Sequence, residues 1–342
     1  MEPINLATRI TFRVLSILAL VGAVFVFRYH LVFAFGSWVL VTALDPLVSK
    51  LEQKKIPRGL SSFIILILTA ITSVAFFNAV IPPLLNQALT LVQNLPQVIS
   101  NALNTLSFWT AQNIDARISP FLEQLTENLS RVIINTPGDL IRIGQSLVTS
   151  FFAAIAFIII TSYFLIEYPR IASNFIQLFP PKQRDLIEQK ITVINLRIGG
   201  WVRGQIILLL VIGISTWFGL TLLQIPFALS LGIIAGVMEI IPMIGPIISM
   251  FPALIVALAI SPWKAASIII LYFLIQQIEN SFVVPRVMKH TSGLDPLVVI
   301  IALFLGGHFL GISGTIVAIP AVLVAWTLLE DSFSNAQKKK GA

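Results

Sequence analysis

An apolar run from Phe227 to Ile260 constrains the fold of this chain most strongly, because Glu239 is its only ionisable residue. A membrane-spanning helix needs about 20 apolar residues, so this run is too long for one such helix. Prolines near its centre interrupt helical hydrogen bonding, since each interior proline lacks a backbone N–H group. We therefore expect two half-helices that meet at a bend formed by Pro242, Gly245 and Pro246.

The composition is that of a membrane protein. Hydrophobic residues make up 57% of it and charged residues 11%, whereas a soluble domain carries about 25% charged residues. We expect an all-α, polytopic membrane protein with about eight membrane elements. The chain has no cysteine, and its three histidines are scattered. We therefore expect no disulfide, no metal site and no cofactor beyond a coupling ion.

Helical spacing and turn residues divide the chain into five parts. We expect three spans in residues 1–83 and amphipathic helices outside the membrane in residues 84–145. Residues 146–203 would hold a fourth span and a basic helix on the cytoplasmic membrane surface. Residues 204–262 and 263–342 would each hold a span and a broken run, the second followed by a basic tail. Asp45-Pro46 and Pro169 are expected to end the second and fourth spans.

Basic residues favour an orientation with both termini in the cytoplasm. In this orientation the inner segments collect most of the 22 lysines and arginines. The outer side keeps Arg28, Arg117, Arg131, Arg142 and Lys264. Residues 84–145 would then lie on the outer side of the membrane, opposite the cytoplasm.

A second overlong apolar run extends from Leu294 to Leu329. The expected breaking residues in it are Gly306, Gly307, Gly311, Gly314 and Pro320. Residues 248–257 align with residues 316–325 at five of ten positions. Each run follows a full span, which predicts two span-plus-hairpin units of inverted topology. Such units are typical of transporters with a site near the bilayer midplane, although apolar sequences also align by chance.

Four polar residues in the membrane segments are candidates for transport chemistry. Glu239 would bind a proton, a cation or a polar solute, or else cap the free N–H groups of a half-helix. Gln276 and Asn280 share a helical face and would line a pathway, or else mark a helix end in solvent. His308 would carry a proton, or else form an interior hydrogen bond. Asp295 is expected to cap the helix that starts at Pro296.

An enzymatic function is not expected. Ser313 lies in a Gly-Ile-Ser-Gly sequence similar to the serine motif of rhomboid proteases. A serine nucleophile needs a base within hydrogen-bond reach, and His308 is the only histidine in or after this segment. The chain also lacks a phosphate-binding loop of the Gly-x-x-x-x-Gly-Lys type, so ATP-driven pumping is unsupported.

An ordered set of motifs over nearly the whole chain resembles the autoinducer-2 exporter family of bacterial membrane proteins. Three matching segments lie in and before the first apolar run, at residues 226–229, 239–246 and 252–253. Three more follow, at residues 277–286, at residues 294–299, and at the glycines and the proline of residues 306–320. Asp45-Pro46 departs slightly, since the family more often has Asn-Pro there. The resemblance implies an exporter of small polar solutes that forms a homo-oligomer in a bacterial inner membrane. Some relatives are described as sodium/proton antiporters.

The sequence therefore predicts a secondary transporter. We expect the tips near 242–246 and 306–314 to meet around a midplane site, with Glu239 in coupling or recognition and Gln276 and Asn280 in the lining. A cation/proton antiporter with the same architecture is the first alternative. A membrane scaffold protein without transport activity is the second. No nucleic-acid partner is expected, because no basic, aromatic soluble face is present.

Overall fold

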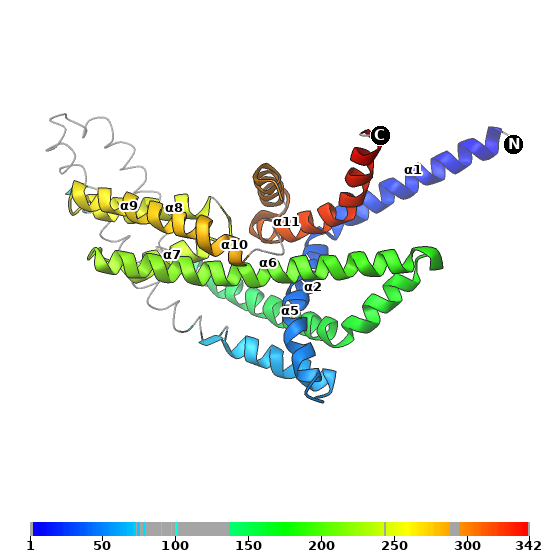
Figure 1. Ribbon diagram of the computed structural model, residues 1–342, viewed down its shortest axis with the longest axis horizontal. Helices are drawn as coiled ribbons and strands as arrows, with labels where there is room; N and C mark the ends of the chain where they lie inside the picture. Colours follow the sequence, from blue (N-terminus) through cyan, green and yellow to red (C-terminus); the bar gives the residue numbers. More distant parts are fainter. Residues whose placement is uncertain are drawn as a thin grey trace.

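The computed structural model describes residues 3–72, 137–242, 244–287 and 294–340, with isolated positions between 74 and 101. Within these ranges every regular element is a helix (Figure 1). Five of the described helices are long and apolar enough to cross a membrane. The chain is therefore a polytopic all-α membrane protein, as predicted. Most of the expected amphipathic region at 84–145 lies outside the described residues.

The described helices follow the chain in this order. α1 (Pro3–Val26) and α2 (Arg28–Glu52) are followed by a short apolar helix at Arg58–Thr72, by α5 (Pro137–Gln177) and by α6 (Pro181–Leu222). Next come α7 (Ala228–Met238), α8 (Gly245–Leu258), α9 (Pro262–Ile278), the π-helix η1 (Glu279–Val283), α10 (Val284–Val287) and α11 (Pro296–Lys340). In Figure 1, α6 is the long central helix, with α7, α8 and α9 beside one half of it and α2 crossing the other half.

Three buried clusters hold these helices together. The first joins the end of α6 to α7, α8 and α9 through Leu220, Leu231, Val256 and Ile268, among others. The second joins α2, the start of α6 and α11. The third joins α2 to α5 and to the helix at Arg58–Thr72. α6 is therefore the element that connects the hairpin region to the N-terminal helices.

The prolines that were expected to end two spans lie inside helices. α2 continues through Pro46 to Glu52, and α5 continues through Pro169 to Gln177. A proline frees carbonyl groups one turn earlier, and neighbouring helices can satisfy such groups. Arg203 of α6 donates to the Ala43 carbonyl oxygen at 3.3 Å. The α6 backbone at Gly199 lies directly against the Thr42 carbonyl, where a Cβ atom would clash. The prediction that Pro46 stops the second span was therefore wrong.

The basic segment before residue 203 is also arranged differently from the prediction. It is not a separate surface helix, because α6 runs without interruption from Pro181 to Leu222. No proline follows Pro181 within α6, and Gly199 and Gly204 are buried. Ile194 and Ile198 pack against α2 and α11 instead of facing lipid headgroups. At 1.5 Å per residue α6 is roughly 60 Å long, about twice the thickness of a bilayer core.

Arg58 fastens the loop after α2 to two neighbouring helices. Its guanidinium pairs with Asp45 and, at 3.2 Å, with Glu52. It also donates to the carbonyl oxygens of Leu165 and Ile166 in α5, at 3.1 and 3.3 Å. Asp45 therefore serves as an anchor for this arginine within a continuous helix.

The first apolar run has the expected break. α7 ends at Met238, and α8 begins at Gly245 with Pro246 in its first turn, where proline is well tolerated. Pro242 lies in the turn between them. The two half-helices pack together, because a Cβ atom at Gly245 would collide with the backbone of Met238.

The second apolar run has a narrower break than the sequence indicated. Within α11 only Gly311 has a non-helical backbone, with φ 63° and ψ −148°. The backbones of Gly306 and Gly314 are in close contact, although they are eight positions apart. A straight helix would separate them by about 12 Å, so the chain turns back at Gly311. Gly306, Gly307, Gly314 and Pro320 lie in helical segments, where the small glycines permit the two arms to approach closely.

Replacing Gly311 by alanine should destabilise the protein. Its backbone conformation is nearly exclusive to glycine, and holding another residue there costs about 1–3 kcal/mol. No atom lies within 4 Å of a Cβ at this position, so the effect would come from the backbone alone. Gly36→Ala is the matched control, since its Cβ would make only ordinary contacts. Thermal unfolding in detergent should show a lower midpoint for Gly311→Ala only, and equal midpoints would contradict the strained turn.

Candidate functional site

Two buried carboxyl groups meet beside the first break. Glu239 is the C-cap residue of α7 and is 1% exposed. Glu279 is the first residue of η1 and is 5% exposed. Their side chains are neighbours that interact electrostatically. Two neighbouring buried carboxyl groups cannot both be ionised without a large electrostatic cost, so the pair is a natural place for a proton or a cation.

Two glutamines hold the carboxyl pair in place. The Gln276 side chain donates to Glu279 Oε2 at 3.0 Å. The Gln205 side chain on α6 donates to the backbone carbonyl oxygen of Glu239 at 2.6 Å. Glu239 Oε2 and Gln205 Oε1 are both buried and have no hydrogen-bond partner among the described residues. The site therefore has two oxygen acceptors available for a ligand.

The surroundings of Glu239 are electronegative. A helix C-terminus carries a partial negative charge, and Glu239 lies at that end of α7. Within the described ranges, neither Glu239 nor Glu279 forms a salt bridge to a lysine, arginine or histidine. The capping alternative is not supported, since the N-terminus of α8 receives no side-chain cap. A positive charge would therefore be stabilised here.

The π-helix explains why Glu279 is buried while its neighbours are exposed. A π-helical turn is wider than an α-helical one and is frequent at functional sites. η1 begins at Glu279, directly after α9, and Asn280 and Gln277 on either side of Glu279 are exposed. Gln276 belongs to the carboxyl site, whereas the Asn280 side chain is exposed.

His308 lies apart from the carboxyl pair. It is exposed and stacks against Phe304, with the ring centroids 6.4 Å apart, and against the edge of Phe309 at 5.1 Å. The expected helix cap is present at the start of α11, where the Leu297 N–H donates to Asp295 Oδ1 at 2.7 Å.

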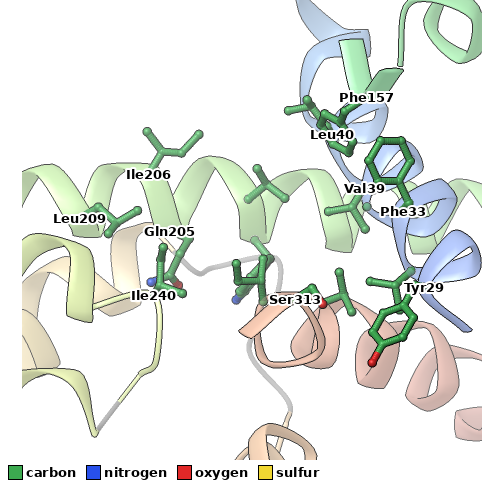
Figure 2. A pocket seen from close by; sticks show the side chains of 16 residues that line it. Tyr29, Phe33, Val39, Leu40, Phe157, Gln205, Ile206, Leu209, Ile240 and Ser313 are labelled. Carbon is green, nitrogen blue, oxygen red and sulfur yellow. The ribbon is translucent and has the colours of Figure 1, made fainter. Parts of the chain in front are cut away.

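A cavity of about 600 Å³ lies between the N-terminal helices and the two breaks. Ile240 of the first break and Ser313, just after Gly311, both line it. Figure 2 shows Gln205 beside Ile240 at one end and Tyr29 at the other. The residues near the two breaks thus border one space, with Gln205 between this space and Glu239.

Sequence reasoning missed Glu279 and Gln205 as candidates. Glu279 looked like part of a polar helix end, and only the π-helical turn separates it from its exposed neighbours. Gln205 lies in an apolar span, where a single glutamine has no partner in the sequence. Each is a polar side chain next to a long apolar stretch, which marks it as unusual, but only the tertiary structure brings it to the site.

The fold and the site are those of a multi-pass membrane transport protein. The family profile described as "AI-2E family transporter" matches residues 14–334. The chain belongs to this family, and the resemblance noted in the sequence is confirmed.

Curated relatives carry names that agree with this class. The putative transport protein YueF of Bacillus subtilis is 28% identical over 302 residues, covering 84% of this chain and 79% of YueF. YrrI of the same organism, also a putative transport protein, is 26% identical and covers 82% of this chain and 80% of YrrI. The putative permease PerM of Escherichia coli is 22% identical, with 79% of each chain covered.

Replacing Gln205 by leucine should destabilise the protein. The change leaves the buried Glu239 carbonyl without its donor, and an unsatisfied buried acceptor costs about 1–3 kcal/mol. Gln277→Leu is the control, because Gln277 is exposed and such changes stay within about 0.5 kcal/mol. Thermal unfolding in detergent measures both. An unchanged midpoint for Gln205→Leu would mean that water replaces the lost donor.

Proposed function

We propose that this protein is a secondary transporter that exports a small solute across a bacterial inner membrane by alternating access. The observation that carries the proposal is the buried Glu239–Glu279 pair beside a broken helix. Buried acids in membrane segments commonly belong to proton or ion pathways. Transport, and not catalysis, is the activity that this arrangement supports.

Alternating access would use the two hairpins as gates. α7–α8 and the two arms of α11 each turn at a break, and residues of both breaks border one cavity. In transporters with paired broken helices, substrate and coupling ions bind where the breaks meet. One hairpin would open to the outside and the other to the cytoplasm, with both termini on the cytoplasmic side. The exposed apolar faces of these helices would contact lipid and further copies of the chain.

Coupling would use the carboxyl pair. Loading Glu239 and Glu279 with a proton or cation removes their mutual repulsion and allows α7 and η1 to stay together. Release of that charge would separate them and loosen the first hairpin. Gln205 would transmit this change to α6, because its amide bonds to the Glu239 backbone.

A sodium/proton antiporter is the second candidate. It is favoured by the two unpartnered oxygens at the negative end of α7, since half-helix C-termini suit cations. A sodium gradient that changes the internal pH of proteoliposomes containing only this protein would select this candidate.

Glu239→Gln and Glu279→Gln should each abolish coupled transport. An amide group cannot release a proton, so each variant would lose one of the two ionisable groups and, with it, the mutual repulsion that drives the change. The measurement is pH-dependent flux in proteoliposomes, with labelled autoinducer-2 and labelled dodecanoate as the solutes and sodium as the first cation. We expect both variants to fall to the level of empty liposomes. Glu188→Gln, at an exposed position on α6, should transport normally.

If both variants show the same flux as the wild-type protein across a pH series, Glu239 and Glu279 have no role in coupling. No flux of any tested solute, together with wild-type stability of Glu239→Ala, would instead favour a membrane scaffold protein.

A further inference from the structure

The cavity beside the breaks has little capacity for a polar solute. Its polar groups are the side chains of Tyr29, Gln205 and Ser313 and the Trp201 indole N–H, and aliphatic and aromatic groups dominate the remainder of its lining. Ser313 already donates to the Leu310 carbonyl at 2.8 Å, and the Gln205 amide nitrogen donates to Glu239, so that Gln205 offers only its Oε1 acceptor. A dehydrated polar group without a new partner costs about 1–3 kcal/mol by mutational measures. A solute with many hydroxyl groups would therefore bind poorly here.

A positive charge lies beside one end of the cavity, next to the lining residue Tyr29. The Arg28 guanidinium lies 4.9 Å from the centre of the Tyr29 ring and donates to its hydroxyl at 3.4 Å. In the described part of the chain Arg28 forms no salt bridge with a carboxylate. This end, at the start of α2, therefore suits an anionic group.

The middle of the cavity has room for an apolar chain because of Gly36. A Cβ atom there would lie 3.7 Å from the Phe157 ring and 4.0 Å from Val317, which is ordinary contact. Any larger side chain at this position would project into the space between α2, α5 and α11. A cavity of about 600 Å³ falls within the range of about 300–1,000 Å³ that is typical of small-molecule sites.

We propose that this cavity binds a single-chain amphiphilic anion. Its head group lies at Arg28 and Tyr29, and its apolar chain passes Gly36 and Phe157 towards Gln205. The inference rests on the proposed function, because it makes this amphiphile the transported solute. It replaces the small polar solute expected from the sequence with a substrate that has an apolar body.

Quenching of tryptophan fluorescence by a terminally brominated dodecanoate tests binding without any transport. Trp201 lines the cavity, and Trp217 on the same helix is 44% exposed away from it. Two single-tryptophan proteins, each retaining one of these residues, are placed in nanodiscs. We expect Trp201 to reach half-quenching at a mole fraction about tenfold lower than Trp217, equivalent to about 1.4 kcal/mol of preference for the cavity.

Three variants of the Trp201 protein test the geometry. Gly36→Leu should remove the tenfold preference, and Gly36→Ala should keep it. Arg28→Gln should weaken binding of the brominated acid about tenfold while leaving binding of its uncharged methyl ester unchanged. If Gly36→Leu fails to fold, the Arg28 comparison still decides the outcome.

Three results would overturn the inference. Equal quenching of Trp201 and Trp217 would mean that the acid is only dissolved in the bilayer. Quenching of Trp201 by a brominated phosphatidylcholine that dodecanoate does not displace would assign the cavity to membrane lipid. No quenching of Trp201 by either compound would mean that protein, such as a second copy, fills the space. Binding is measured without a gradient, so it does not depend on transport. If Glu239→Gln loses flux but Trp201 is still quenched, the binding site stands on its own, which separates this inference from the proposed function.

Discussion

This structure depends on one constraint: backbone N–H and C=O groups in an apolar environment must find hydrogen-bond partners within the protein. A carbonyl or N–H group freed by a proline or a turn costs several kcal/mol in lipid unless protein supplies a partner. The chain frees such groups repeatedly, and α6 supplies partners at two of these places. Arg203 donates to α2 near Pro46, and Gln205 donates to the first break. α6 therefore contributes to the stability of these two segments.

The carboxyl pair depends on the same arrangement. Glu239 is buried because α7 ends at that residue, and it stays there because Gln205 holds its carbonyl. Glu279 reaches it only through the wide turn of η1. A regular helix at either position would point the carboxyl group elsewhere. Departures from regular structure thus place charge where a regular membrane helix would exclude it.

The sequence was sufficient for the class of fold and for the position of both breaks, because apolar length and glycine or proline content act locally. Prediction from the sequence failed where contacts between distant segments determine the local structure. Pro46 does not end α2, and α6 packs directly against the Thr42 carbonyl that the proline leaves without its N–H donor. The basic helix is continuous with the next span, since its isoleucines find partners on α2 and α11. Glu279 and Gln205 could not be assigned to the site, because a π-helical turn and a contact between residues 205 and 239 leave no local pattern.

The uninterrupted length of α6 has a mechanical consequence. One end of this helix is packed into the N-terminal helices and α11, and the other end is packed into the first hairpin. The close contact between Gly199 and Thr42 lies within the first of these packed regions, and the Arg203 side chain lies beside it. α6 joins the two packed regions as one continuous helix. Over the stretch to Leu222, a tilt of about 5° moves the far end by about 3 Å, so a small rotation at the scaffold becomes a displacement comparable to a helical half-turn at the hairpin.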